Sequence, residues 1–194
     1  MRNKKVLFIV QAAVIAAVYV VLTYFISAFN LASGAIQVRI SEALCILPFF
    51  TPAAIPGLFL GCLLSNLLTG CIIWDVIFGS LATLLGALGT WLISGKPGQE
   101  KIGASYNSSA DTHKEIKNAH DGNVGSAGKN KWLAPLPPIA ANTLIVPFVL
   151  YYAYHFPGSI PYFMLTVGIG EIISCGVLGY ILLNVLNRYK KYIF

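Results

Sequence analysis

Long stretches without any charged residue alternate with short charged clusters along the chain. The charge-free stretches are residues 6–38, 43–74, 76–95 and 132–170. A helix needs about 20 apolar residues to cross the ~30 Å hydrocarbon core of a bilayer, so each stretch is long enough for at least one crossing. The pattern therefore predicts an all-α integral membrane protein.

Turn signals divide these stretches into six transmembrane spans. Pro52 and Pro56 end a short apolar segment and begin a new helix, and "HFPGSIP" forms a turn before the last span. Both ends of the chain are basic, which favours the cytoplasmic side for both and requires an even number of crossings. The expected spans are about 5–28, 41–50, 54–70, 74–94, 138–154 and 160–186, with the second one short or tilted.

Residues 95–131 differ in composition from the rest of the chain. They are rich in Gly, Ser, Asn and Lys and have no apolar period, which predicts a flexible cytoplasmic linker within a single transmembrane domain of residues 1–194. Only 10% of the 194 residues are charged, whereas soluble domains have about 25%. The net charge of +6 gathers in the linker and at the two ends, so it indicates membrane orientation and not nucleic-acid binding.

Outside the linker and the termini, only four charged residues remain: Arg39, Glu42, Asp75 and Glu171. A charge at the centre of a bilayer costs about 2.5–3.5 kcal/mol or more, so these residues are candidates for a functional site. Each has a second interpretation. Arg39 and Glu42 are spaced to pair with each other on one helix face. Asp75 is placed to stabilise a helix start, and Glu171 to be a buried, paired or protonated glutamate near the middle of the last span.

Amides and one tryptophan extend the candidate set. Gln37, Asn66 and Asn142 lie in or beside apolar spans, where an unpaired amide is costly. Trp74 is either a membrane-interface residue or a stacking wall for a flat ligand, and Tyr154 is interpreted as a membrane-interface residue. Three acids and one base favour a cationic or donor-rich ligand. A catalytic carboxylate pair is the weaker alternative, because the sequence has no metal-ligand cluster, hydrolase motif or phosphate-binding loop.

Small residues spaced four apart predict close helix contacts. In the first span these are Ala12 and Ala16, and Ala13 and Ala17. Gly57, Gly61 and Ser65 repeat the spacing in the third span. Two interpretations stand for the first span, namely packing within this chain and docking onto a separate membrane subunit.

Several long motifs occur in order along the chain: "AIQVRISEAL", "LPFFTPAAIPGLFLGCLLSN", "DVIFGSLATLLGAL", "PLPPIAANTLIV" and "VGIGEIISCGVLG". Together they resemble the queuosine-precursor transporter (QueT) family, the S components of energy-coupling factor (ECF) transporters. The resemblance covers nearly all of the chain except residues 95–131. It implies a six-helix S-component bundle in the plasma membrane of a bacterium, with both termini cytoplasmic.

The resemblance also implies partners and a cargo. The partners are a membrane scaffold subunit, which docks through Ala12, Ala13, Ala16 and Ala17, and two ATPase subunits, which use the ATP, so that this chain is not an enzyme and has no cofactor of its own. The cargo is a 7-deazaguanine such as the aminomethyl form, or queuine.

We expect Glu171 to accept hydrogen bonds from the guanine-like edge of the cargo. Glu42 or Asp75 is expected to contact its amine. Arg39 is expected either to orient Glu42 or to donate to the ring carbonyl. Asn142, Gln37 and Asn66 add polar contacts, and Trp74 a stacking face. The alternatives are an S component for another vitamin or nucleobase, and a small intramembrane enzyme.

Overall fold

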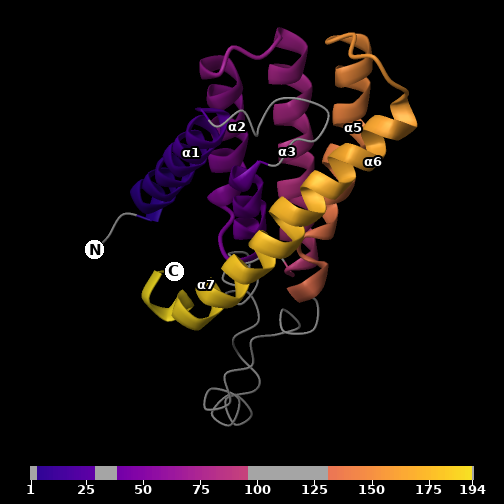
Figure 1. Ribbon diagram of the computed structural model, residues 1–194. Helices are drawn as coiled ribbons and strands as arrows, with labels where there is room; N and C mark the ends of the chain where they lie inside the picture. Colours follow the sequence, from indigo (N-terminus) through magenta and orange to yellow (C-terminus); the bar gives the residue numbers. More distant parts are fainter. Residues whose placement is uncertain (1–3, 29–38, 96–130, 194) are drawn as a thin grey trace, which may run out of the picture.

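The computed structural model describes residues 4–28, 39–95 and 131–193, and the regular elements in this part of the chain are all helices (Figure 1). The elements in order are α1 (Lys4–Ala28), η1 (Ile40–Phe49), α2 (Ala54–Leu68), α3 (Ile73–Ile93), η2 (Lys131–Leu133), α5 (Leu136–Tyr152), α6 (Ile160–Glu171), η3 (Ile172–Leu178) and α7 (Gly179–Ile193). Residues 96–130 of the predicted linker lie outside the described residues.

Four helical segments are long and apolar enough to cross a membrane. They are Lys5–Ala28, Ile73–Ile93, Lys131–Tyr152 and Ile160–Arg188, the last of which combines α6, η3 and most of α7. Ile40–Phe49 and Ala54–Leu68 are shorter apolar helices. The prediction of an all-helical membrane protein with six helices, of which the second is short, is therefore confirmed.

The helices form a bundle around the short second helix. α1 packs on α2, α2 on α3, α3 on α5 and α5 on α6, while the long helix from α6 to α7 runs obliquely across the bundle (Figure 1). η1 lies inside and contacts α1, α2, α3, η3 and α7. Its residues 41–49 are all buried. Ten residues of 3₁₀-helix span about 20 Å, which is less than the ~30 Å of a hydrocarbon core. Because its neighbours cover η1, this helix does not need to reach both membrane surfaces.

Small residues bring α1 close to α2. A Cβ atom added at Gly57 would lie 2.7 Å from the backbone oxygen of Ala12, and one at Gly61 would lie 2.8 Å from Cβ of Tyr19 and 3.1 Å from Cα of Ala16. Only glycine leaves room for such an approach. The spacing of Ala12 and Ala16 in the sequence therefore serves packing within this chain.

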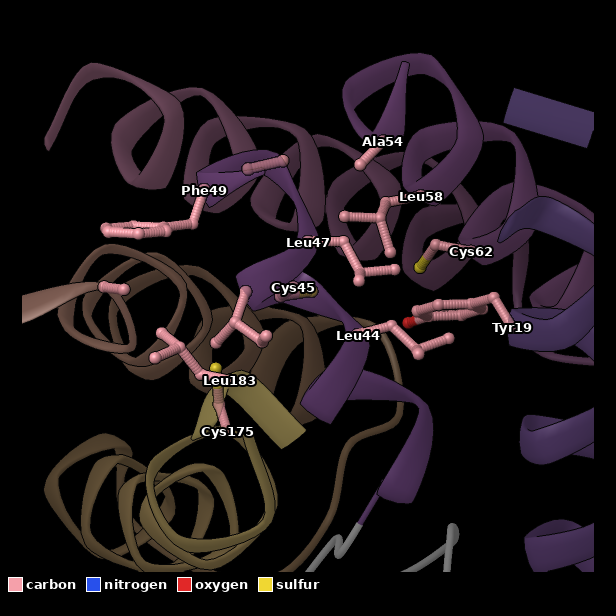
Figure 2. Close-up of a cluster of buried hydrophobic side chains, with 13 residues drawn as sticks. Tyr19, Leu44, Cys45, Leu47, Phe49, Ala54, Leu58, Cys62, Cys175 and Leu183 are labelled. Atoms are coloured by element: carbon pink, nitrogen blue, oxygen red, sulfur yellow. The ribbon is translucent and has the colours of Figure 1, made fainter. Parts of the chain in front are cut away.

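The main core cluster surrounds η1. Figure 2 shows Leu44, Cys45 and Leu47 of η1 between Tyr19 of α1 on one side and Cys175 and Leu183 of the long C-terminal helix on the other. Cys45, Cys62 and Cys175 are free and buried, and they pack as small apolar residues. This core fixes η1, which holds Glu42, at the centre of the bundle.

The two ends of the bundle differ. The turn between α2 and α3 and the turn between α5 and α6 lie at the upper end in Figure 1, whereas the last turn of α3 and the first turn of α5 lie at the lower end. α1 begins and α7 ends toward that lower end. α3 begins at the upper end, so its first-turn residue Asp75 lies there.

Candidate functional site

Buried polar side chains from η1, α3, α5 and α6 converge inside the bundle. The exposed fractions are 1% for Glu42, 3% for Asp75, 3% for Asn142 and 6% for Glu171. Glu171 is the last residue of α6, and eleven helical steps of 1.5 Å place it about 17 Å from Ile160 along the helix axis.

Glu42 is held by three hydrogen-bond donors. The hydroxyl of Tyr19 donates to Oε1, while Sγ of Cys45 donates to Oε2 at 3.0 Å and Nδ2 of Asn142 donates to Oε2 at 3.4 Å. Both carboxylate oxygens are therefore occupied, although the residue is almost fully buried. Satisfying the oxygens in this way offsets much of the cost of removing the carboxylate from water.

Asn142 connects Glu42 to Glu171. Its Nδ2 atom also donates to Oε1 of Glu171 at 3.1 Å. The second oxygen of Glu171, Oε2, is buried and has no hydrogen-bond partner. Directly after Glu171 the backbone widens into the π-helical turn η3. Such turns are rare and often occur at functional sites.

Arg39 and Asp75 form a second cluster above the first. Nη2 of Arg39 lies 3.6 Å from Oδ2 of Asp75, and the hydroxyl of Tyr154 donates to the same oxygen at 3.1 Å. The backbone N–H of Ile72 donates to the Tyr154 hydroxyl at 3.4 Å. Burial raises the pKa of Tyr154, and the Asp75 carboxylate raises it further, so this hydroxyl keeps its proton and donates. The pairing interpretation for Arg39 and Glu42 is wrong, because the guanidinium of Arg39 pairs with Asp75.

A small cavity separates the two clusters. It has a volume of about 10 Å³ and is lined by Arg39, Glu42, Asn142, Val146, Val167 and Glu171. This is about the room that one water molecule needs. Nε of Arg39 is buried without a hydrogen-bond partner, as is Oε2 of Glu171. The cavity therefore has one unpaired donor and one unpaired acceptor in its lining.

Comparison with known proteins identifies the family to which this chain belongs. Residues 9–188 match the family model of the QueT transporter. The chain belongs to the QueT transporter family. A segment of 86 residues is 40% identical to the queuosine precursor transporter QueT of Lactococcus lactis subsp. cremoris (strain MG1363) and covers 44% of this chain and 50% of that protein. The chain thus matches about half the length of this curated relative. No solved structure shows a significant match.

Membership in the QueT family confirms the resemblance seen in the sequence. It also confirms the prediction that the chain is not an enzyme, because the family consists of transporters. Together with the four long apolar helices, it makes the chain a multi-pass membrane protein.

The structure brings together some of the predicted site residues of this QueT family member and not others. Nδ2 of Asn66 donates to the backbone oxygen of Asp75 at 3.4 Å. Asn66 is not among the residues that line the cavity. Trp74 is 54% exposed and lines a separate apolar groove of about 670 Å³ between α3 and α5. Gln37 lies outside the described residues.

Three residues at the site were missed by sequence reasoning. Tyr19 and Cys45 donate to Glu42, and Tyr154 donates to Asp75. The interpretation of Tyr154 as an interface aromatic omitted its hydroxyl. A usable signal did exist for Tyr19, because it follows Ala12 and Ala16 on the same helix face, at positions i+7 and i+3, and that face packs on Gly57 and Gly61.

Proposed function

We propose that this chain is the substrate-binding S component of an ECF-type importer that takes up a queuosine precursor, either a 7-deazaguanine such as the aminomethyl form or queuine. Two observations support the class of cargo: the family of the chain and the printed function of its Lactococcus lactis relative. The observation that carries the site is that two residues lining one cavity each have a buried atom without a partner, namely Oε2 of Glu171 and Nε of Arg39.

The guanine-like edge of a 7-deazaguanine matches this pair of groups. The edge presents a ring N–H and an amino group as donors, next to a ring carbonyl as an acceptor. In the proposed complex, Oε2 of Glu171 accepts from the donors and Nε of Arg39 donates to the carbonyl. Each contact replaces an unsatisfied buried group by a charge-assisted hydrogen bond. Asn142 holds Glu171 through its other oxygen, Oε1.

Asp75 is the better partner for the aminomethyl group. Glu42 already accepts from three donors, whereas Oδ1 of Asp75 is not used by Tyr154 or Arg39, both of which contact Oδ2. A cationic amine beside Asp75 would also add positive charge to a cluster of three acids and one base. Since the cavity holds about one water, binding requires the residues that line it to move apart.

The partner subunits follow from the proposed class. A membrane scaffold and two ATPases would supply the energy, because the sequence has no phosphate-binding loop. We propose that the scaffold contacts the outward face of α1, where Ala13 and Ala17 are exposed. The proposed location is the bacterial plasma membrane with both termini in the cytoplasm, in keeping with the basic ends.

Transport by the reconstituted complex tests the proposal. Proteoliposomes that contain this chain, the scaffold and both ATPases should accumulate radiolabelled 7-aminomethyl-7-deazaguanine when ATP is supplied. Vesicles without this chain, or with a Glu171→Gln variant, are the controls and should accumulate little. Accumulation that is independent of this chain, or chemical conversion of the compound by this chain alone, would contradict the proposal.

A further inference from the structure

Helix α1 contributes a side chain to the centre of the site. Tyr19 is 1% exposed, and its hydroxyl donates to Oε1 of Glu42. Figure 2 shows its ring pointing from α1 toward Leu44 of η1. No other donor to Oε1 of Glu42 is found among the described residues. The orientation of a central carboxylate therefore depends on a helix that lies at the edge of the bundle and packs on α2 and η1.

The position of Tyr19 is fixed from both sides. Gly61 of α2 lies so close that an added Cβ would be 2.8 Å from Cβ of Tyr19. One turn further along α1, the hydroxyl of Thr23 hydrogen-bonds with the Ser41 hydroxyl in η1 at 2.8 Å and with the backbone oxygen of Tyr19 at 2.9 Å. The Tyr19 hydroxyl therefore acts as a held donor and not as a freely rotating one.

A chain of hydrogen bonds leads from Tyr19 to Glu171. Tyr19 holds Oε1 of Glu42, and Oε2 of Glu42 accepts from Asn142 at 3.4 Å. The same Nδ2 of Asn142 donates to Oε1 of Glu171 at 3.1 Å. The amide nitrogen of Asn142 has two hydrogens, and it donates one to each of the two carboxylates. The Asn142 amide is thereby fixed, and Oε2 is the oxygen of Glu171 that stays unpaired.

We propose that Tyr19 is a positioning residue of the binding site. Its hydroxyl sets the orientation of Glu42, which sets Asn142 and through it the free oxygen of Glu171. A displacement of α1 would therefore change ligand affinity without any direct contact between α1 and the ligand. This inference rests on the proposed function where it concerns affinity, whereas the chain of hydrogen bonds itself does not depend on any ligand.

Binding measurements test the effect on affinity. Tyr19→Phe keeps the ring beside Gly61 and removes only the hydroxyl. We expect it to bind 7-aminomethyl-7-deazaguanine about 10-fold more weakly than the wild type, the effect of one hydrogen bond to a charged group. In a Glu42→Gln background the same change should alter affinity less than about twofold, because coupled residues are not additive. Tyr24→Phe is the control, since it removes the hydroxyl of a tyrosine on the same helix that is 62% exposed. Equal losses in both backgrounds would overturn the proposal.

An infrared measurement without ligand separates this proposal from the proposed function. Full-length protein with ¹³C-labelled glutamate should show a shift of carboxyl bands on Tyr19→Phe. Part of that shift should disappear in a Glu171→Gln background if the chain of hydrogen bonds reaches Glu171. A difference spectrum that is unchanged by Glu171→Gln would overturn the proposal. If the wild type binds no 7-deazaguanine, the proposed function fails, while this measurement still decides the role of Tyr19.

Discussion

Single residues at this site divide into satisfied and unsatisfied groups. Glu42 accepts from three donors, whereas Oε2 of Glu171 and Nε of Arg39 are buried without a partner. An unsatisfied buried polar group costs about 1–3 kcal/mol, and more if it is charged. A ligand that pairs both groups recovers this free energy on binding. The site therefore favours a ligand that presents donors next to an acceptor.

Glu171→Gln should weaken binding of 7-aminomethyl-7-deazaguanine by at least about 10-fold. The amide has one acceptor oxygen where the carboxylate has two, and hydrogen bonds to charged groups contribute about 1.5–3 kcal/mol. Isothermal titration calorimetry on purified protein measures the change. Ser174→Ala is a matched control, because it removes a buried hydroxyl without a partner three residues further along the same helix. An unchanged dissociation constant for Glu171→Gln would contradict the assignment.

Arg39→Lys separates contact with the ligand from pairing with Asp75. Lysine keeps the positive charge but loses the planar set of donors that includes Nε. We expect about 10-fold weaker binding of a 7-deazaguanine, and less than about a twofold change for a 7-deazapurine that lacks the ring carbonyl. Competition binding with the two compounds makes the comparison. Equal losses for both would show that Arg39 acts only through Asp75.

The sequence revealed the charged residues of the site better than their partners. Arg39, Glu42, Asp75 and Glu171 stand out because charge is scarce in apolar spans, and three of them line one cavity. Which residues pair depends on helices distant in sequence, so the spacing of Arg39 and Glu42 offered a pair between them as one interpretation, although Arg39 contacts Asp75. The face that Tyr19 shares with Ala12 and Ala16 indicated that it is buried, but only the fold places its hydroxyl at Glu42.

Among the elements, α1 has two faces with different roles. Ala16 is 8% exposed and packs on Gly61, whereas Ala17 is exposed on the outward face. The sequence offered packing and docking as alternatives for the same alanines. The structure supports packing for Ala12 and Ala16, whereas Ala13 and Ala17 are exposed, and docking of a partner on them stays a proposal.

A matched pair of leucine substitutions tests this division. Ala16→Leu should lower the melting temperature in detergent, since overpacking a close helix contact costs about 1–3 kcal/mol. Ala17→Leu should leave the melting temperature unchanged but reduce co-purification with the scaffold subunit. The reverse pattern, in which Ala16→Leu is stable and Ala17→Leu unfolds, would contradict the assignment of the two faces.

The sequence did not predict which types of helix η1 and η3 form. The prolines and the length of the apolar segment predicted a short second helix, and η1 is one. It is wound as a 3₁₀-helix, and a π-helical turn follows Glu171. No residue pattern in "ISEALCILPF" or "IISCGVL" specifies these windings.

The whole molecule has the arrangement expected for an even number of crossings. α1 begins and α7 ends toward the lower end in Figure 1, while the turns 69–72 and 153–159 lie at the upper end with Asp75. Asp75, in the first turn of α3, therefore lies toward the end opposite to the chain ends. If the chain ends are cytoplasmic, Asp75 lies toward the outer surface, where an importer receives its cargo.

Cysteine labelling in intact cells tests this orientation. In a Cys71→Ser background the three remaining native cysteines are buried. Ser159→Cys lies in the exposed turn after α5 and should react with a membrane-impermeant maleimide from outside. Arg188→Cys, which is exposed near the end of α7, should react only after the membrane is opened. The opposite pattern would invert the topology.

Calorimetric titration of the purified, full-length protein with a panel of ligands tests the central claim most directly. The panel contains 7-aminomethyl-7-deazaguanine, queuine, guanine and several vitamins. The account predicts one binding site that prefers a 7-deazaguanine over guanine and over every vitamin, with the aminomethyl form favoured by Asp75. Binding of a vitamin in preference to all 7-deazaguanines, or no binding of any 7-deazaguanine, would contradict it.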